Sequence, residues 1–585
     1  MIAGIDLGTT NSLIGVYDSG FPTLLADSEG KRLVPSVVFY DGKGNTILVG
    51  HEARRMQAIQ PEQTISSVKR LIGRRFGDKG TEDLSGASGT PIFLNLGEKQ
   101  YSPEEVSAEI LKRLKAIAEA RLGTEVTRAV ITVPAYFNDA QRAATRRAGE
   151  LAGFSVERII SEPTAAALAY GLDKLQDSSK IAVYDLGGGT FDLSILQLDN
   201  GIFQVLATHG DTRLGGDDLD QVIAELLIEK ASLSALSTTD SIRLHEAARN
   251  AKELLSLEEQ TAIRLPFLEG GKNLEITLTR AEIEKACFPI IRRTRTHCLR
   301  ALEDAGLTPS DLDHVILVGG STRMPLVQRL AAEIFGKEPN LSQHPDEAVA
   351  LGAILQGAIL EGNLQHVALL DITPLSLGIE TFGGLMNVII PRNTTIPAKA
   401  GELFTNAVAG QSGMKITILQ GERELAADNW KLGNFEIPFN PAAKGAARIG
   451  VQFSVDADGI LQVLARDTDK GTEKIVEIKS AVEVSDEAVE AMLAGSLEHA
   501  FEDMDARIFT EARLKAEEML PAVEAALAQL KTELLDDEIA LIRHLAEEVE
   551  TALETKETAS LKKALTNLDN ATQSIATKLI EKAMK

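Results

Sequence analysis

The same short pattern occurs twice in this chain: an apolar run, a glycine-rich turn that opens with aspartate, and an alternating run. The turns are Asp6 to Ser12 and Asp185 to Asp192, and the runs around them are Ile2 to Ile5, Leu13 to Tyr17, Ile181 to Tyr184 and Leu193 to Leu198. Each copy predicts a strand, a turn and a second strand. Glycine lets backbone N–H groups approach a phosphate, threonine adds a hydroxyl donor, and aspartate can hold a metal through water. Two such turns facing each other would bind a nucleotide polyphosphate from both sides, so we predict an ATP-binding protein.

The composition predicts a soluble protein of three or four domains. The chain has 585 residues, which is too long for one hydrophobic core, and its 44% hydrophobic and 25% charged residues are ordinary. The net charge of −25 argues against a nucleic-acid partner. No apolar run reaches the ~20 residues of a membrane span, so we expect no membrane partner. The first motif begins at Asp6, which leaves no room for a signal peptide.

Cys287 and Cys298 are the two cysteines of the chain, and they lie eleven residues apart in a helical pattern. On one helix they would be about 16 Å apart, too far for a disulfide. We expect both to be small buried side chains in a reducing compartment, and therefore a cytoplasmic protein.

Residues 1 to 365 alternate apolar strands with amphipathic helices. A second repeated feature lies in this part, because Ala129 to Pro134 and Val315 to Gly320 are both strands that lead through a loop into a helix. We therefore predict a duplicated α/β unit. Ligands of such sheets bind at the carboxyl ends of the strands, here between the two halves.

The pattern changes near residue 365. Short alternating strands follow, such as Lys415 to Leu419 and Ile449 to Val455, with a hairpin turn at Asp456 to Gly459. After Gly495 the apolar residues recur at helical spacing, as at Ile542, Leu545, Val549 and Leu553. The predicted organisation is an ATPase domain (1–365), a linker (366–371), a β-sandwich (372–482) and a helical bundle or lid (483–585).

Several ordered motifs resemble those of the heat-shock protein 70 chaperones, of the bacterial DnaK type. They are GIDLGTTNS (from Gly4), VKRLIGR (from Val68), VPAYFND (from Val133), EPTAAALAYG (from Glu162), Asp185 to Asp192, VILVGGSTRMP (from Val315), Leu370 to Thr381 and LQGERELAADN (from Leu419). The resemblance covers essentially the whole chain. It implies an actin-like, ribonuclease H-like ATPase domain, a β-sandwich that binds substrate and a helical lid.

The resemblance also implies roles for single residues around ATP, Mg²⁺ and, as a further candidate, K⁺. Asp6 and Asp185 would hold Mg²⁺ through water, and the catalytic residues would be Lys69, Glu162, Thr190 and Asp192. The phosphates would be bound by Gly8, Thr9, Thr10, Asn11, Gly187, Gly188, Gly189 and Thr190. The adenosine pocket would be formed by Lys252, Ser256, Gly319, Gly320, Ser321, Arg323 and Asp346. Phosphoryl transfer depends on positioning and charge neutralisation, and these residue types supply both.

Each of these residues also has an ordinary structural interpretation. Lys69 could be a solvated surface charge beside Arg70, Arg74 and Arg75. Glu162 could cap the helix that follows it, and Asp192 could be a turn residue. Lys252 and Ser256 could be exposed helix positions. The surrounding motifs favour the functional interpretation in each case.

In the β-domain the family binds an extended hydrophobic peptide. The matching positions here are Ile379, Thr381, Phe382, Leu385, Phe404, Ala407, Met414 and Ile416. Single apolar residues on such strands are more often core, so the hypothesis depends on the group. The linker residues Val367, Leu369, Leu370 and Asp371 would couple the domains if they dock in one nucleotide state and not in the other. A buried core strand is the alternative for this segment. The partners implied are unfolded polypeptides and a J-domain co-chaperone.

Four features depart from the family pattern. Arg249 stands where the family usually has a glutamate over the adenine, and Pro266 to Leu274 is shorter than the usual loop that controls nucleotide exchange. Ser161 replaces an asparagine near the J-domain surface, and the chain ends without a long acidic tail. The short loop, the end of the chain and the lid segment Met492 to Met504 resemble the iron–sulfur-biogenesis relative, whereas the β-domain resembles the general chaperone. The first two departures predict fast release of ADP and little dependence on an exchange factor.

The predicted function is an ATP-driven chaperone that captures and releases extended polypeptides. A dedicated chaperone for one client, such as an iron–sulfur scaffold protein, is the alternative within the family. An actin-like small-molecule kinase needs a sugar pocket, and a filament-forming ATPase should end near residue 365. The additional 220 residues argue against both.

Overall fold

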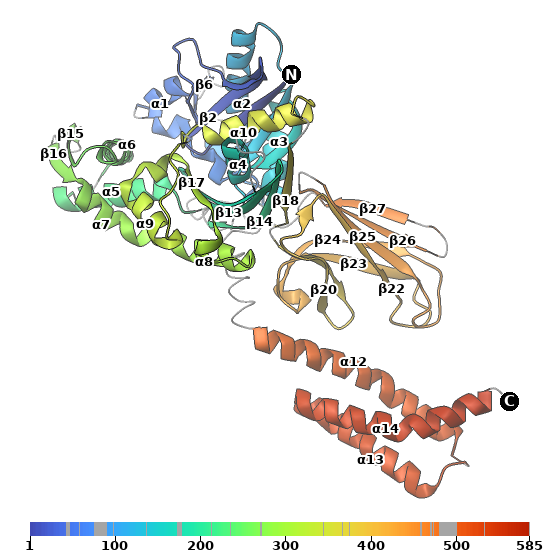
Figure 1. Cartoon of the computed structure of the whole chain (residues 1–585). Helices are drawn as coiled ribbons and strands as arrows, with labels where there is room; N and C mark the ends of the chain where they lie inside the picture. Colours follow the sequence, from blue (N-terminus) through green and yellow to red (C-terminus); the bar gives the residue numbers. More distant parts are fainter. Residues whose placement is uncertain are drawn as a thin grey trace. The chain divides into compact units, whose positions relative to one another are not determined.

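The computed structural model describes residues 1–41, 47–57, 59–74, 76, 90–96, 99–135, 137, 139–171, 178–211, 213–233, 236–268, 272–342, 344–364, 367–373, 375–456, 459–468, 471, 473–478, 500–531 and 533–583 (Figure 1). The chain divides into two compact units. Unit 1 comprises Met1–Leu375, Ile390–Leu403 and Ile449–Ala488, and unit 2 comprises Ser376–Ile389, Phe404–Arg448 and Val489–Lys585.

Two large mixed sheets organise unit 1, and they share one local topology. The first has the order β11-β10-β1-β2-β3, with β4 also paired to β2. The second has the order β17-β12-β13-β14-β18-β21. Their strands are β1 (Ile2–Leu7), β2 (Asn11–Asp18), β3 (Phe21–Leu24), β4 (Val34–Pro35), β10 (Arg128–Val133), β11 (Ser155–Ser161), β12 (Ser179–Leu186), β13 (Phe191–Asp199), β14 (Ile202–Asp211), β17 (His314–Val318), β18 (Ala368–Ile372) and β21 (Thr395–Ile396).

The predicted duplication is confirmed by the strand pairing. In the first half β1 forms an antiparallel hairpin with β2 and lies parallel to β10. In the second half β12 forms the same hairpin with β13 and lies parallel to β17. Both glycine-rich turns therefore connect the two strands of a hairpin, and in both halves a later strand joins the first hairpin strand in parallel.

Helices α4 (Glu162–Gly171) and α10 (Ala348–Leu360) pack in a shared core with residues of both sheets, among them Ile2, Val130, Val183 and Ile316. Glycine permits this close packing: a Cβ on Gly352 of α10 would overlap the backbone of Ala165 in α4. The remaining helices of unit 1 are α1 (His51–Gln57), α2 (Pro103–Leu122), α3 (Asp139–Leu151), α5 (Gly216–Ala231), α6 (Thr238–Leu255), α7 (Arg280–Ile291), α8 (Thr294–Asp304) and α9 (Pro325–Phe335).

Local sequence signals set the ends of these helices. α2 begins at Pro103, directly after its N-cap residue Ser102. The side chains of Ser102 and Glu105 each accept a hydrogen bond from the other's backbone N–H, which forms a capping box. It ends at Gly123, whose φ of 67° lies in the left-handed region. Among the described residues before 365, unit 1 also has three short sheets and several 3-10 turns. The sheets are β5 (Val37–Tyr40) with β6 (Ile47–Val49) and β7 (Thr64–Ser66), β8 (Leu94–Leu96) with β9 (Lys99–Tyr101), and β15 (Gln260–Leu268) with β16 (Lys272–Thr279). The turns are η1 (Pro61–Gln63), η2 (Val68–Arg70), η4 (Pro309–Asp311) and η5 (Gly320–Arg323).

The predicted antiparallel strands after residue 372 are confirmed, and they form two four-stranded sheets. One has the order β22-β25-β26-β27 and lies in unit 1 except for Phe404, and the other has the order β20-β19-β23-β24 and lies in unit 2 except for Ile390. Their strands are β19 (Leu377–Thr381), β20 (Leu385–Ile390), β22 (Ala398–Phe404), β23 (Gly413–Gln420), β24 (Trp430–Pro438), β25 (Ile449–Val455), β26 (Leu461–Asp467) and β27 (Glu473–Ile478). A short turn, η6 (Ala426–Asp428), precedes β24.

Three long helices end the chain in unit 2: α12 (Ala500–Gln529), α13 (Asp536–Thr555) and α14 (Thr558–Ala583). The predicted apolar stripe packs between them, since Ile542 and Val549 are buried and Leu545 and Leu553 are partly buried in the same core. α12 is also held to the loops of the β20-β19-β23-β24 sheet. The ion pairs are Arg423 with Asp503, Arg507 with Glu424 at 2.5 Å, and Lys444 with Glu518 at 3.1 Å.

The linker segment forms β18 and extends the second sheet. It runs parallel to β14, with Leu369 opposite Phe203, and pairs on its other edge with β21. Val367, Leu369 and Ile372 enter the shared core of unit 1, while Ala368 is exposed and Leu370 is half-buried. The structure thus shows the alternative of a largely buried strand, docked on the second large sheet, and the coupling role stays a prediction.

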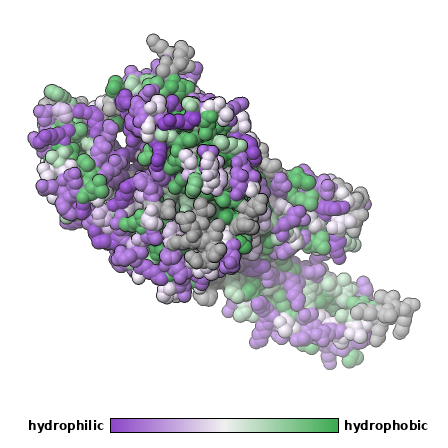
Figure 2. All heavy atoms as spheres, turned by 45° about the horizontal axis from the view of Figure 1, so that its top comes forward, coloured by the Kyte–Doolittle hydropathy of each residue, from purple (hydrophilic) through white to green (hydrophobic). Residues whose placement is uncertain are grey.

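Polar side chains dominate the face drawn in Figure 2, with hydrophobic side chains gathered in smaller groups. Among the described residues, no helix is long and apolar enough to cross a membrane.

Candidate functional site

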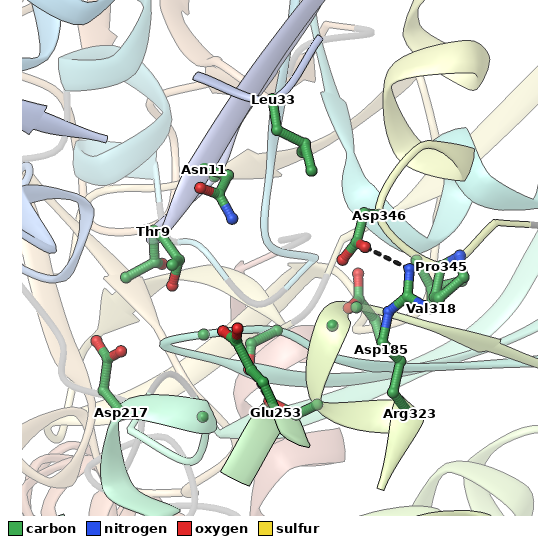
Figure 3. A pocket seen from close by; sticks show the side chains of 18 of the residues that line it. Thr9, Asn11, Leu33, Asp185, Asp217, Glu253, Val318, Arg323, Pro345 and Asp346 are labelled. Atoms are coloured by element: carbon green, nitrogen blue, oxygen red, sulfur yellow. Dashed lines mark hydrogen bonds and ion pairs between the residues drawn. The ribbon is translucent and has the colours of Figure 1, made fainter. Parts of the chain in front are cut away.

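A cavity of about 530 Å³ opens between the two halves of unit 1, each built on one of the two large sheets. These halves, within residues 1–364, are called the ATP-binding part after the prediction from sequence. This volume is typical of a small-molecule site. Figure 3 shows side chains from both halves around it, with Thr9 and Asn11 on one side and Asp217 and Glu253 on another. Nearly all residues predicted to bind nucleotide or metal line this cavity: Asp6, Gly8, Thr9, Thr10, Asn11, Lys69, Glu162, Asp185, Gly187, Gly188, Thr190, Lys252, Ser256, Gly319, Gly320, Ser321, Arg323 and Asp346.

The two glycine-rich turns face each other at one end of the cavity. A Cβ on Gly188 would overlap the hydroxyl oxygen of Thr10, and one on Gly189 would lie 2.7 Å from that of Thr9. Gly189 itself is not among the residues that line the cavity. Since neither glycine has a positive φ, their absence of side chain serves close approach and not an unusual backbone conformation. The facing arrangement predicted from the sequence is confirmed.

Buried carboxylates surround this end of the cavity. Burial, and then the nearby Glu162 carboxylate, raise the pKa of Asp6 to about 7. The same two causes raise the pKa of Asp185 well above its usual range. Thr132 donates a hydrogen bond to Asp6 at 3.0 Å and so fixes the orientation of its carboxylate. The site therefore concentrates negative charge where little water can screen it.

These carboxylates fit a divalent cation. Mg²⁺ prefers oxygen ligands, usually one or two carboxylates with several waters and substrate phosphates. Asp6 and Asp185 come from the first strands of the two hairpins and line the same cavity. Among the described residues there is no cluster of three or more His, Cys, Asp or Glu side chains arranged as metal ligands. A cation bound beside these two carboxylates would offset the repulsion between them.

Lys69 forms an ion pair with Glu162 inside the cavity. Lys69 is only 5% exposed and Glu162 only 8%, so the solvated-surface interpretation of Lys69 is wrong. η2 positions the lysine, and its ammonium also lies 5.9 Å from the centre of the Phe137 ring. Glu162 is the first residue of α4, so it does begin a helix, but its carboxylate points to Lys69. Arg75 lies outside the described residues.

Thr190 lines the cavity, whereas Asp192 does not. Asp192 is buried directly opposite Asp185 in the β12–β13 hairpin, and its charge contributes to the raised pKa of Asp185. It is therefore a strand residue and not a turn residue. Its position behind Asp185 allows it to act on the site through that carboxylate.

The other end of the cavity carries the predicted adenosine residues. Arg323 and Asp346 form an ion pair at 2.6 Å, which Figure 3 shows at the cavity edge. Ser321 donates a hydrogen bond to the Gly187 carbonyl at 3.0 Å. Gly319 has a φ of 85°, and a Cβ there would lie 2.6 Å from an Asp185 carboxylate oxygen, so glycine is required twice over.

Lys252 and Ser256 are not the exposed helix positions of the alternative interpretation. Lys252 is buried and pairs with Asp220 at 2.7 Å, and it also donates to the Gly216 carbonyl at 2.9 Å. Ser256 is half-buried and donates to the Lys252 carbonyl at 2.9 Å. Both side chains thus line the cavity while bonded to their own half of the protein.

Arg249 has two acidic partners, which the sequence did not reveal. It donates to Asp217 at 2.8 Å and to Asp220 at 2.9 Å. Both acidic partners lie on α5, in the same half as Arg249, so these two contacts do not themselves join the halves. Sequence reasoning also missed several other cavity residues: Leu33, His51, Arg54, Asp217, Asp220, Glu253 and Leu257. The run of aspartates after Gly215-Gly216, at the start of a helix, was the available signal for two of them.

The predicted peptide-binding residues lie in unit 2 and fall into two groups. Ile379, Leu385 and Ile416 are at most 5% exposed and are core residues of the sheet. Phe382 is 64% exposed, and Thr381, Phe404, Ala407 and Met414 are partly exposed. The turn that carries Phe382 lies under α12, since a Cβ on Gly383 would be 2.9 Å from Thr510 and 3.0 Å from Leu514. Only the second group is accessible to a ligand in this structure.

Two of the departures noted above take a different form in the structure. Ser161 is buried at the end of β11 and bonds to the Thr164 hydroxyl, so it cannot itself form part of a partner surface. The stretch Pro266 to Leu274 forms the tip of the β15–β16 hairpin, and residues 269–271 within it lie outside the described residues. The lid residues 492–499 also lie outside them. Cys287 and Cys298 are both buried and free, as predicted.

The family model described as Hsp70 protein matches residues 2–581, which is nearly the whole chain. The chain belongs to the Hsp70 family. Hsp70 proteins are chaperones and ATPases that bind ATP or ADP, typically with Mg²⁺, and they generally interact with unfolded polypeptides and J-domain co-chaperones. The mixed α/β part and the C-terminal helices of this Hsp70 are consistent with the family's ATPase domain and lid.

Proposed function

We propose that this Hsp70 is a DnaK-type chaperone of the cytoplasm that couples ATP hydrolysis to the capture of extended hydrophobic polypeptides. The observation that carries the proposal is the cavity in which two glycine-rich hairpins face each other around a buried Lys69–Glu162 pair and two carboxylates. Phosphoryl transfer needs this combination of donors, cation ligands and a positioned lysine, with little covalent chemistry from the protein.

Each side chain has a defined task in this mechanism. Thr9, Thr10 and the backbone of the second turn would hold the phosphates, and Asp6 and Asp185 would hold Mg²⁺. The bound cation would supply neutralisation of phosphate charge. Lys69 stabilises charge that develops on the γ-phosphate, and Glu162 orients Lys69 and the attacking water. Thr190 contributes a hydroxyl at the same place.

Peptide capture is assigned to the accessible members of the predicted group, above all Phe382 and Met414. The three ion pairs that hold α12 against the sheet loops support a lid that closes over this region. Ile416 is nearly fully buried, so its replacement by aspartate would test the stability of the sheet and not the pocket.

Coupling is assigned to the docked linker. β18 buries Leu369 against β14, and Arg392, just before β21, forms a bidentate ion pair with Asp304 of α8 at 2.8 and 3.2 Å. Because β21 pairs with β18, these contacts change together if the linker leaves its sheet. A differential contact of this kind is what allosteric coupling requires.

A dedicated chaperone for one client, such as an iron–sulfur scaffold protein, is the second candidate within the family. Its support is the short β15–β16 hairpin and the resemblance of the lid sequence. The two candidates differ in client range, which capture of bound polypeptides by a hydrolysis-deficient variant distinguishes: many unrelated sequences support the general chaperone, and one recurrent protein supports the dedicated one. An actin-like small-molecule kinase is a distant third.

The proposal is tested by peptide affinity in the two nucleotide states. A fluorescent leucine-rich peptide should bind roughly ten times more tightly with ADP than with ATP. Phe382→Ala should weaken binding in the ADP state, whereas Val388→Ala, at an exposed β20 position outside the predicted group, should not. Equal affinity with both nucleotides would contradict coupled capture, and equal effects of the two substitutions would contradict the assigned surface.

A further inference from the structure

Asp217 accepts hydrogen bonds from both halves of the ATP-binding part. The hydroxyl of Ser67, just before η2 in the first half, donates to one carboxylate oxygen at 2.8 Å. Arg249, on α6 in the second half, donates to the other oxygen at 2.8 Å. Each oxygen therefore accepts one of these hydrogen bonds, and the two donors lie 182 positions apart in the sequence. The Nε atom of Arg70 also lies 3.9 Å from the oxygen that Ser67 contacts.

Asp218, the next residue of α5, makes a second connection between the halves. Arg70 of η2 donates to its two carboxylate oxygens at 2.7 and 3.4 Å. The same guanidinium donates to the Gly189 carbonyl at 3.1 Å in the second glycine-rich turn. Bidentate arginine–carboxylate contacts are among the stronger ion pairs, and Arg70 is only partly exposed. Two adjacent carboxylates of the second half are thus bonded to two neighbouring residues of the first half.

Arg249 makes this arrangement of carboxylates favourable. Asp217, Asp218 and Asp220 lie within the first five residues of α5, where the helix dipole attracts negative charge but the carboxylates repel one another. Arg249 bridges Asp217 and Asp220, and Lys252 bonds to Asp220 as well. Burial alone would lower the pKa of Arg249, but Asp217 and Asp220 raise it overall, so the guanidinium stays charged.

One contact at the cleft opposes closure. Arg54 of α1 lies near Arg249, and burial followed by this like charge lowers the pKa of Arg54. Glu253, Glu246 and Asp217 act in the opposite direction on the same guanidinium. The repulsion is therefore partly compensated, and Ser67 and Arg70 still donate direct hydrogen bonds from the first half to the second.

We propose that Ser67, Arg70, Asp217 and Asp218 form a clasp that retains bound nucleotide, and that Arg249 is a positioning residue that orients Asp217 for it. The inference rests on the proposed nucleotide site, since Asp217 and Arg249 line the same cavity. The two halves cannot separate around a nucleotide unless Ser67 leaves Asp217 and Arg70 leaves Asp218. Arg249 thus stabilises closure, although it replaces a glutamate in the family pattern. We therefore expect the clasp to slow spontaneous release of ADP, whereas the sequence alone predicted fast release.

The test is stopped-flow release of a fluorescent ADP analogue from the full-length protein. Ser67→Ala and Asp217→Asn should each accelerate release about fivefold or more, because each removes or weakens the same charge-assisted hydrogen bond. The double variant should release no faster than the faster single variant. Ser67→Asn should restore retention, because asparagine supplies an N–H donor and tolerates the φ of 54° at this position. Ser28→Ala, at an exposed turn of the first half, is the matched control.

Arg249→Gln separates positioning from general stability. It should accelerate release in the native background and have no further effect in the Ser67→Ala background, since both act through Asp217. Single-turnover hydrolysis and ADP release should both stay within about twofold in the Ser28→Ala control. Unchanged release in Ser67→Ala and Asp217→Asn would overturn the clasp, and an additive effect of Arg249→Gln would overturn the positioning role. If the native protein binds no ADP analogue at all, the proposed nucleotide site itself is refuted.

Discussion

At the residue scale, the phosphate end of the cavity combines one buried ion pair, Lys69 with Glu162, and two further buried carboxylates, Asp6 and Asp185. Lys69 and Glu162 neutralise each other, whereas the raised pKa values of Asp6 and Asp185 show that their charges are unfavourable in the protein alone. The electrostatics of such a site favour binding of a cation together with a phosphate. The repulsion between the buried charges is fully offset only when both are bound.

Lys69→Ala should bind ATP but hydrolyse it at least about 10²-fold more slowly, because the ammonium serves charge that develops in the transition state. Single-turnover hydrolysis and ATP affinity, measured on the same preparation, check this. The substitution also leaves Glu162 buried without its ion-pair partner, which should lower thermal stability. Lys69→Ala combined with Glu162→Gln should recover stability and not turnover. Near-normal turnover in Lys69→Ala would contradict the catalytic role.

A buried pair of histidines makes the stability of the ATP-binding part depend on pH. His209 of β14 and His297 of α8 are hydrogen-bonded through their Nδ1 atoms at 3.0 Å. Burial and then the neighbouring His297 lower the pKa of His209 to about 3, and burial and then Arg300 lower that of His297 to about 4. In the unfolded chain both should titrate near their ordinary value of about 6.5. Below that value the unfolded chain binds more protons than the folded chain, so acid destabilises the fold.

We therefore expect the free energy of unfolding to fall between about pH 6.5 and pH 4, by up to roughly 1.4 kcal/mol per pH unit for each histidine. Calorimetry at pH 7, 6 and 5 measures this. The unfolding transition of the ATP-binding part is identified as the one that added ADP shifts to higher temperature. His297→Asn retains hydrogen-bonding groups and removes one titration, so its stability should depend less steeply on pH. An identical slope in native and variant proteins would show that other groups dominate.

At the element scale, the two β-hairpins determine the site because the threonine side chains of the first turn pack directly against the glycines of the second. Thr9 and Thr10 occupy the space next to Gly188 and Gly189, so the turns keep one separation. A polyphosphate bound between them would meet donors that are already in place, which reduces the ordering cost of binding.

Gly188→Ala should force the hairpins apart, because its Cβ would overlap the hydroxyl of Thr10 while the backbone φ is acceptable for alanine. Overpacking of this kind typically costs about 1–3 kcal/mol. The matched control is Gly187→Ala, whose Cβ would lie 3.7 Å from the nearest atom. Thermal unfolding of the nucleotide-free protein should show a lower midpoint for the first variant only. If both variants melt alike, the turns are not packed as tightly as described.

The hairpins, the duplicated strand order and the cavity residues were predictable because glycine, threonine and aspartate carry local information at fixed spacing. The apolar stripe at Ile542 and Val549 identified the helical bundle in the same way. The contacts of Arg249 were not predictable, since Asp217 lies on another helix and only the folded structure brings them together. The split of the peptide-binding group was missed for a related reason: alternation on a strand shows which residues share a face, but not how deeply that face is covered.

At the scale of the whole molecule, one short strand, β18, connects the ATP-binding part with the segment around β21. β18 completes the second sheet by pairing with both β14 and β21, and the Arg392–Asp304 ion pair reinforces the same attachment. A change in the linker therefore alters backbone pairing and an ion pair at once, which favours two discrete states over a gradual one.

Leu369→Asp should detach the linker, because it places a charge in the core next to Phe203. Basal hydrolysis and peptide binding should remain, while stimulation of hydrolysis by peptide should be lost. Ala368→Asp adds the same charge at an exposed position and is the matched control. The Arg392–Asp304 ion pair also predicts that Asp304→Arg and Arg392→Asp each weaken stimulation and that the double exchange restores it. If peptide still stimulates ATP hydrolysis in Leu369→Asp, the linker only tethers the two parts and does not couple them.

Helix α4 has a further mechanical consequence. It begins at Glu162, beside Lys69, and ends at Gly171, where a Cβ would meet the ring of Phe203. Phe203 is the residue that faces Leu369 across the β14–β18 pair. Ten residues of helix span about 15 Å and resist compression along their axis. One end of this rigid helix therefore lies at the proposed phosphate site, and the other contacts Phe203, which pairs with the linker. A movement of Glu162 along the helix axis would be transmitted to Leu369 through the single ring of Phe203.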